Sequence, residues 1–302
     1  MSTVPLGTIV VAIEDSAANL PAILAALRPG AHPDCEFLFF ATEETVLLGL
    51  PANLSNLRGL RCASGARIPE MWRDGIVAAR SEWVALLTAH VVPAPNWLPA
   101  LLEAAPQGEV VGVGGYFSND ERATPLDWAI YLLRYAAFSR PGSREVTHIA
   151  ADNAVYRRSE ILACTDLLAH GFWEVEYHVR FLAKGLRLRL SAALQVIHVN
   201  RYTRAGFAAQ RREHGFAFGR DRARRLGFAQ LALHALAAPL VPAVLYAKVL
   251  TRVRRHGWLA ATPIAAYAWL FYFVLHWAWG EARGVFHEFT RRITCQPWLQ
   301  RR

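Results

Sequence analysis

The stretch from residue 71 to residue 104, MWRDGIVAARSEWVALLTAHVVPAPNWLPALLEA, decides the fold. Its central segment, EWVALLTA (82–89), is predicted to be a buried strand, because apolar residues run through it without a helical period. The flanking segments 68–80 and 96–105 have helical spacing. Helix, strand and helix in this order are typical of a parallel sheet covered by helices.

The same alternation runs from residue 8 to about residue 115. It predicts further strands at 8–13, 35–41 and 109–117, and one more helix at 16–28. We therefore expect an α/β domain with a mostly parallel sheet and helices on both faces. Ligands of such sheets bind at the carboxyl ends of strands, where Glu14, Thr88 and His90 lie in this sequence.

The middle third is less regular. A helix is expected over 125–138, a strand running into a helix over 148–162, a helix over 171–185 and an edge or half-exposed strand over 186–200. In the third of these segments the apolar residues step by three and four, which predicts one buried helix face. That face consists of Phe172, Val175, Val179, Leu182 and Leu186.

The composition is apolar and basic. Hydrophobic residues make up 54% of the chain and the formal net charge is +9. Only Lys184 and Lys248 are lysines, so 31 of the 33 basic residues are arginines, whose guanidinium groups bind phosphate and anionic lipid well. A nucleic-acid binder is disfavoured, because the arginines adjoin long apolar runs and lack an interleaved aromatic stacking pattern.

The four cysteines are scattered without any Cys-x-x-Cys pair, which predicts neither a zinc knuckle nor a disulfide framework. The N-terminal segment MSTVPLGTIVVAIED has no basic residues before its short apolar run. We interpret it as the first strand and expect no cleaved signal peptide.

Two apolar runs follow residue 225, at 228–250 and 258–279, each about long enough to cross a bilayer at roughly 1.5 Å per residue. They predict a membrane-associated helical hairpin with a basic tail over 226–302, after a catalytic-type domain over 1–225. Spanning helices, a monotopic hairpin in one leaflet and a soluble helical subdomain remain open. The arginine distribution predicts that the first domain faces the cytoplasm.

Several motifs resemble family 2 glycosyltransferases, which have the GT-A fold. Arg73-Asp74-Gly75 stands at the family's Arg-Asn-x-Gly helix, and Pro93 and Trp97-Leu98 follow as in the family. Thr88 and His90 fall where the family has its Asp-x-Asp aspartates. The resemblance implies a UDP- or GDP-linked sugar donor, a divalent Mn²⁺ or Mg²⁺ ion, and donor contacts from Glu14, Asp74, Thr88 and His90.

The segment GFWEVEYHVRFLAKG (171–185) resembles the family's Glu-Asp segment. Its second carboxylate is the general base of an inverting transfer, and by resemblance that role falls on Glu174, with Trp173 beside it at the acceptor. A base aligned with the acceptor hydroxyl is what such a displacement requires. The alternative is that Glu174 only complements the positive end of its helix.

Four further residues are candidates. Asn153, in a segment that resembles the family's acceptor side, either binds acceptor or caps a turn. His198 could share a metal ion with His90, or be a core histidine. Arg211 and Arg212 could clamp a diphosphate, or belong to a basic helix at a membrane surface.

The sequence thus predicts an inverting glycosyltransferase that acts on a lipid-linked or polysaccharide acceptor at the cytoplasmic face of a bacterial-type membrane, as part of cell-envelope chemistry. The loss of the donor-site acids leaves an alternative: a catalytically degenerate binding or scaffold protein that supports a partner membrane enzyme.

Overall fold

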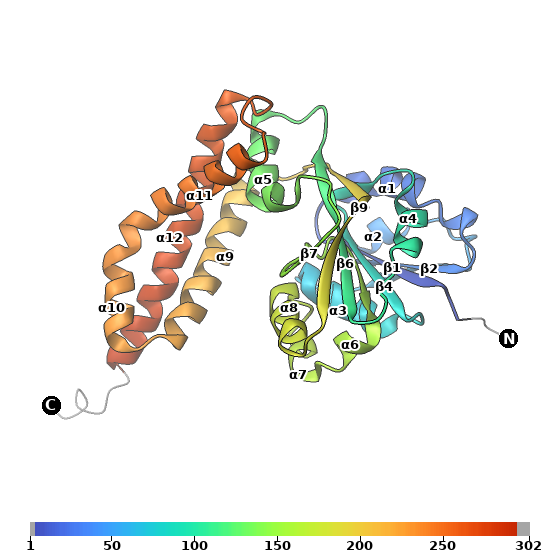
Figure 1. Cartoon of the computed structure of the whole chain (residues 1–302), viewed down its shortest axis with the longest axis horizontal. Coiled ribbons are helices and arrows are strands. Elements are labelled where there is room, and N and C mark those ends of the chain that lie inside the picture. Colours follow the sequence, from blue (N-terminus) through green and yellow to red (C-terminus); the bar gives the residue numbers. More distant parts are fainter. Residues whose placement is uncertain (1–3, 295–302) are drawn as a thin grey trace. The chain divides into compact units, whose positions relative to one another are not determined.

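The computed structural model describes residues 4–294 and divides the chain into two compact units, each built from two separate segments (Figure 1). The first unit comprises residues 4–121 and 137–201, and the second comprises residues 122–136 and 202–294. This division differs from the predicted boundary at residue 225, because the helix that ends there packs with the C-terminal helices.

The first unit begins with a parallel half-sheet in the order β3-β2-β1-β4. Its strands are β1 (Gly7–Ile13), β2 (Cys35–Ala41), β3 (Leu57–Arg61) and β4 (Trp83–Thr88). Every residue of β1 and β2 is buried, as expected for strands covered on both faces. The connecting helices are η1 (Ala17–Asn19), α1 (Leu20–Leu27), η2 (Pro29–Ala31), α2 (Glu44–Leu47) and α3 (Ile68–Ala78).

The sheet continues past β4 as β8-β6-β9-β5, with β7 on β9. Its strands are β5 (Val91–Pro93), β6 (Val110–Asn119), β7 (Arg144–Val146), β8 (Asn153–Arg157) and β9 (Arg187–His198). β8 runs antiparallel to both neighbours, whereas β6 and β9 are parallel. The helices of this half are α4 (Trp97–Glu103), η3 (Ala136–Phe138), α6 (Arg158–Leu162), α7 (Thr165–Leu168) and α8 (Glu174–Ala183).

The predicted α/β class is confirmed, and the parallel pairing is concentrated in the first half of the sheet. β9 is not an edge strand, since it pairs with β6, β5 and β7. Its alternation arises because one of its two faces is largely exposed. Short β5 and β7 were not predicted, since three residues carry too little periodicity.

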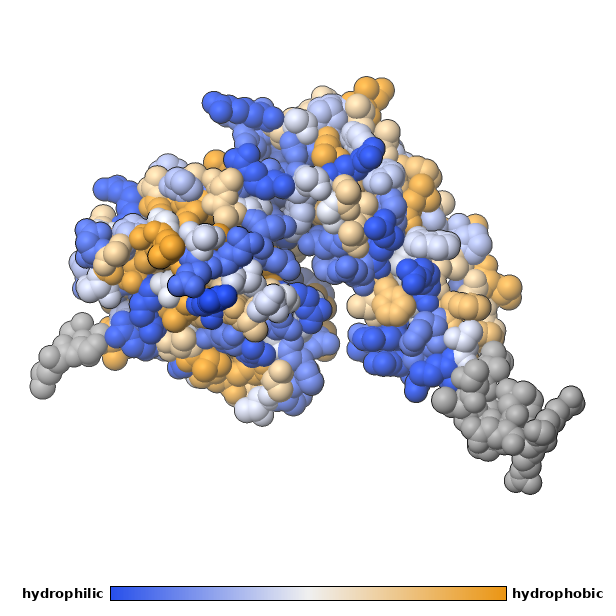
Figure 2. All heavy atoms as spheres, turned by 180° about the vertical axis from the view of Figure 1, so that it is seen from behind, coloured by the Kyte–Doolittle hydropathy of each residue, from blue (hydrophilic) through white to orange (hydrophobic). Residues whose placement is uncertain are grey.

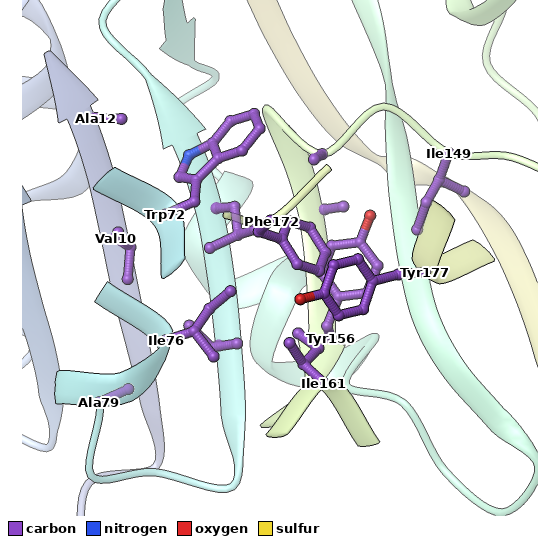
Figure 3. Packing of buried hydrophobic residues seen from close by; sticks show 14 of the residues in the cluster. Val10, Ala12, Trp72, Ile76, Ala79, Ile149, Tyr156, Ile161, Phe172 and Tyr177 are labelled. Atoms are coloured by element: carbon purple, nitrogen blue, oxygen red, sulfur yellow. The ribbon is translucent and has the colours of Figure 1, made fainter. Parts of the chain in front are cut away.

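One core face of the sheet, shown in Figure 3, carries Val10 and Ala12 of β1 and Tyr156 of β8. α3 covers this face closely, because Gly75 has no side chain. A Cβ atom at Gly75 would lie 2.3 Å from Cγ1 of Val10. The glycine of the Arg73-Asp74-Gly75 motif therefore sets the distance between helix and sheet.

The predicted apolar face of α8 is wrong. Val175 is 56% exposed and Val179 is 59% exposed, whereas Tyr177, His178 and Phe181 are buried. Both sets have helical spacing, and the aromatic set buries more area, so it takes the side facing the sheet.

The second unit is helical. It consists of α5 (Pro125–Tyr135), α9 (Arg204–Arg225), α10 (Phe228–Ala237), η4 (Ala238–Leu240), α11 (Val241–Arg255) and α12 (Ile264–Thr294). α9 and α12 pack backbone against backbone at glycines four residues apart. A Cβ at Gly219 would lie 2.2 Å from the Glu281 carbonyl oxygen, and one at Gly284 would lie 2.2 Å from that of Phe216. Gly215 and Gly280 make equally close approaches.

Within residues 4–294, one helix is long and apolar enough to cross a membrane by length and composition, Ala229–Arg255, and 6% of its most apolar window is buried. The prediction of two such helices is not met. The second apolar run begins in a loop and continues as α12, one flank of which is occupied by α9. Three arginines of the predicted basic tail, Arg283, Arg291 and Arg292, belong to α12, and its last two, Arg301 and Arg302, lie outside the described residues.

We expect Gly219→Ala to destabilise the second unit by about 1–3 kcal/mol, because the new methyl group must push α9 and α12 apart. Denaturant unfolding followed by circular dichroism measures this. Gly206→Ala is the control on the same helix, since its Cβ meets only the Thr203 hydroxyl, at 3.1 Å. Equal stability of the two variants would contradict the close packing.

Candidate active site

The link between β4 and β5 consists of two residues, Ala89 and His90, and lies at the carboxyl edge of the parallel half-sheet. Asn19 pins this link: its Nδ2 donates to the Ala89 carbonyl at 2.8 Å and to the Val199 carbonyl at 3.0 Å. Arg201 Nε in turn donates to Asn19 Oδ1 at 2.9 Å. We call Thr88, Ala89 and His90 the sheet corner.

His90 is buried, and the chain after β1 engages both of its ring nitrogens. Nδ1 lies 2.7 Å from Ser16 Oγ, and Nε2 lies 2.9 Å from Asp15 Oδ1. Asp15 is 45% exposed, so this histidine connects the corner to a carboxylate at the surface. In this arrangement His90 holds the loop after β1, and a metal ion would have to displace one of these two contacts.

His198 ends β9 beside the sheet corner. In the antiparallel β5–β9 pair, His198 is opposite Val91, and the Val199 N–H donates to the His90 carbonyl at 2.9 Å. His198 is fully buried, like the corner residues. Across the described ranges, no three His, Cys, Asp or Glu side chains form a group that could hold a metal. The metal site shared by His90 and His198 stays a prediction.

Glu174 is the first residue of α8, where the preceding turn brings it against the start of α3. Gly171 has a φ of +105°, which favours glycine, and the Phe172 N–H donates to the Pro69 carbonyl at 2.8 Å. Trp173 precedes Glu174 as the N-cap residue of α8, and the Arg67 guanidinium lies 5.1 Å from its ring centroid. Glu174 is half-buried, at the end of a helix that covers the sheet.

Behind Glu174, one helical turn along α8, lies a buried His178–Tyr156 pair. His178 Nε2 is 3.0 Å from the Tyr156 hydroxyl, and the rings are stacked with centroids 5.9 Å apart. Burial, with a smaller effect from His148, lowers the pKa of His178 to about 3. Burial raises the pKa of Tyr156 well above its usual value, and the charges of Glu174 and Asp152 raise it further.

Asn153 has a structural role. It is fully buried: its Oδ1 accepts from Trp97 Nε1 at 2.8 Å, and its Nδ2 donates to the carbonyls of Tyr116 and Leu194. An acceptor could reach this amide only by breaking these bonds. We therefore do not assign it to acceptor binding, and the capping alternative is replaced by a bridge between β6, β8, β9 and α4.

Two further residues were predicted to contact the donor, Glu14 and Asp74. Glu14 is exposed and directly follows β1. Asp74 is 44% exposed and accepts from Arg73 Nε at 2.7 Å. Asp74 also acts on buried Cys62, whose pKa is raised to about 11, first by burial and then by this charge.

Arg211 and Arg212 belong to α9 in the second unit. Arg211 lies over the Phe207 ring and contacts His214, and burial lowers the pKa of its guanidinium to about 10. Arg212 lies 3.0 Å from Nδ1 of His276. Their predicted diphosphate clamp stays a prediction.

Two polar side chains in this region were not predicted as site residues. Asp152 is buried directly before β8. The Asn119 side chain, at the end of β6, has a buried amide whose oxygen and nitrogen have no hydrogen-bond partner. Both residues lie at the ends of strands that the sequence predicted. Only the order in which the strands pair shows which strand ends are adjacent.

The family comparison covers this same region. Residues 55–162 match the model of glycosyl transferase family 2, a segment that runs from before β3 through the sheet corner to α6. The predicted resemblance is confirmed over this segment. No curated protein matches the chain.

Among solved structures, the crystal structure of GalNAc-T7 with UDP, GalNAc and Mn²⁺ matches this chain with a TM-score of 0.50. The match has 12% sequence identity and covers 67% of this chain and 45% of that chain. It shows a GT-A-like fold, and the chain spans less than half the length of that neighbour. UDP and Mn²⁺ are ligands of GalNAc-T7.

The depressed pKa of His178 predicts an acid-sensitive fold. In the unfolded chain His178 binds a proton near its usual pKa of about 6.5, whereas in the folded protein it does so near 3. The contribution of the neutral, buried His178 to the unfolding free energy is therefore fully present above about pH 6.5. Between these values it falls, by up to about 1.4 kcal/mol per pH unit.

His178→Gln removes this contribution, so its unfolding free energy should change less between pH 7 and pH 4 than that of the wild type. Chemical denaturation at a series of pH values measures the slope. Exposed His170→Gln is the control and should retain the wild-type slope. A wild-type slope in His178→Gln as well would show that other groups cause the acid sensitivity.

Proposed function

We propose that the protein is an inverting glycosyltransferase that moves a sugar from a UDP- or GDP-linked donor to a lipid-linked or polysaccharide acceptor. The observation that carries this proposal is the position of Glu174. Glu174 is the first residue of α8, which packs on the core face formed by strands of the family 2 segment, and the turn before it is hydrogen-bonded to α3 through Phe172 and Pro69.

In the proposed reaction, a Glu174 carboxylate oxygen accepts the proton of the acceptor hydroxyl as that oxygen attacks the anomeric carbon. The bond between the anomeric carbon and the diphosphate oxygen breaks on the opposite side, and the electron pair leaves with the nucleoside diphosphate. The products are a glycoside of inverted configuration and a protonated Glu174. Holding base and hydroxyl in line supplies much of the acceleration.

The described side chains do not fit a divalent ion held by protein groups alone, since no three acidic, histidine or cysteine side chains cluster within residues 4–294. The proposed mechanism therefore has no step through a metal. We propose that the side chains of Thr88 and His90 line the donor side of the site, at the sheet corner.

A second proposal concerns the membrane. Leu233, Leu236, Leu240 and Val244 step by three, four and four along α10 to α11, and each is at least half exposed. Arg252, Arg254 and Arg255 are exposed at the end of the same helix. Figure 2 shows hydrophobic residues along the second unit. An apolar stripe with flanking arginines suits a bilayer with anionic head groups.

We propose that this helix lies in one leaflet and does not cross the bilayer. Val249 and Val253 are buried, and the Tyr246 hydroxyl donates to the Tyr267 carbonyl of α12 at 3.2 Å. α12 in turn is joined to the arginine-rich α9 through the glycine contacts. Crossing would break these contacts or bring several arginines into hydrocarbon, at a cost of at least about 2.5 kcal/mol each.

A degenerate scaffold protein is the second candidate function. It is favoured by the sheet corner, where Thr88 and His90 replace two acids and His90 is engaged by Asp15 and Ser16. Calorimetry with UDP- and GDP-sugars, with and without Mn²⁺, separates the candidates. Binding to no donor would favour the scaffold.

Glu174→Gln should lower transfer turnover by about 10²- to 10⁴-fold, because the amide cannot accept the hydroxyl proton, while donor affinity stays near wild type. Glu176→Gln is the matched control, since Glu176 is exposed two residues further along α8. Product formation by mass spectrometry measures turnover. Full activity in a folded Glu174→Gln protein would eliminate the proposed base.

Replacing Leu236 and Leu240 with glutamate should abolish flotation of the protein with vesicles that contain anionic lipid, since both apolar area and charge attraction are lost. The exposed valine pair Val175 and Val179, in the first unit, provides the control substitution to glutamate. Undiminished flotation of the leucine variant would show that another surface binds the membrane.

A further inference from the structure

The Thr88 hydroxyl requires an explanation. Thr88 is 1% exposed, and its Oγ1 has no hydrogen-bond partner. Such a group is rare in native proteins, because leaving a buried hydroxyl without a partner is costly. As the last residue of β4, Thr88 stands at the carboxyl edge of the sheet, where this class of fold binds ligands. The missing partner therefore indicates a bound group at the corner.

A carboxylate follows in the neighbouring strand. β4 and β8 are antiparallel, and their last paired residues at this edge are Leu87 and Asn153. Thr88 follows Leu87 and Asp152 precedes Asn153, so the two residues would be the next pair in this register. Facing residues of antiparallel strands have Cβ atoms roughly 5 Å apart. Asp152 is 6% exposed, so the carboxylate is as enclosed as the hydroxyl.

Asp152 and Glu174 act on the same region. The charges of both carboxylates raise the pKa of the Tyr156 hydroxyl, so both lie near one buried ring. Tyr156 and Ala12 belong to the core face that α3 and α8 cover, and Ala12 is the residue paired with Thr88 in the β1–β4 ladder. Figure 3 shows this face with Ala12, Trp72 and Tyr156. Thr88 and Asp152 thus border the same part of the fold as Glu174.

The chemistry of the pair selects its ligand. A carboxylate accepts hydrogen bonds from two hydroxyl groups, and a threonine hydroxyl both donates and accepts. Adjacent hydroxyls on a sugar ring match this set. A diphosphate does not, because its negative charge repels the carboxylate.

We propose that Thr88 and Asp152 bind ring hydroxyls of a sugar beside Glu174, with Asp152 supplying a carboxylate from β8 where the family's strand β4 would carry acids. This inference rests on the proposed glycosyl transfer and adds the residues that recognise the sugar. The sugar is that of the donor or of the acceptor, and the experiment separates these sources.

The experiment compares Asp152→Asn and Thr88→Val with the wild type in steady-state transfer assays, varying donor and acceptor separately. We expect the KM for one sugar substrate to rise about 10- to 100-fold, with a smaller change in kcat. The substrate whose KM rises identifies the source. Asp34→Asn, an exposed acid of the first unit, is the control and should keep wild-type constants.

Deoxy analogues of that substrate test recognition directly. Removing the hydroxyl that Asp152 contacts should weaken the wild type about tenfold or more and leave Asp152→Asn almost unchanged. Thermal unfolding checks that the variants are folded, and Thr88→Ser supplies a hydroxyl that should restore most of the affinity lost in Thr88→Val.

The outcomes separate the inference from the proposed function. Wild-type kcat and KM values in both variants would overturn the inference but not the proposed function. A change in Mn²⁺ dependence alone would do the same. If the wild type transfers no sugar but calorimetry detects sugar binding that Asp152→Asn loses, the inference stands and the proposed function fails. If the wild type neither transfers nor binds any sugar tested, both fail.

Discussion

The two-residue link between β4 and β5 is the constraint on which the first unit depends. β4 pairs with β1 and β8, whereas β5 lies four positions further along the strand order and pairs with β9. So short a link is possible only if the sheet curls until the end of β9 approaches the end of β4. The amide of Asn19 holds this curl by bridging Ala89 and Val199. The corner that the family uses for acids is here part of the framework that closes the sheet.

The sequence predicted the regular elements well, because buried strands and amphipathic helices have periods of their own. The position of the corner followed from family motifs, whereas the turn at Gly171 lies where the sequence predicted helix. The interactions did not follow, since neither periodicity nor motif shows that Ser16 meets His90 or that Asn153 bridges Trp97 and β6. The shared metal site stays a prediction, because the sequence shows that His90 and His198 lie next to strand ends but does not show where their side chains lie.

Composition was a poorer guide in the second unit. Two apolar runs of similar length suggested a hairpin, but hydropathy does not distinguish a helix that faces lipid from one that faces another helix. Glycines determine which of the two apolar runs packs closely against another helix. Gly280 and Gly284 stand opposite Gly215 and Gly219, so α12 meets α9 at backbone distance. The Gly-Glu-x-x-Gly segment at residues 280–284 makes this contact, and its Glu281 carboxylate accepts from Arg222 at 2.8 Å.

The discontinuous second unit also has a consequence for biosynthesis. α5 leaves the ribosome within the chain of the first unit, but its main partner, α12, is translated last among the described helices. Domains usually fold as they emerge, N-terminal part first. Here the apolar side of α5 and the glycine surface of α9 stay exposed to solvent until α12 has been synthesised. Synthesis therefore includes an interval in which the first unit can be complete while its inserted helix still lacks a place to fold, and chaperones would act during that interval.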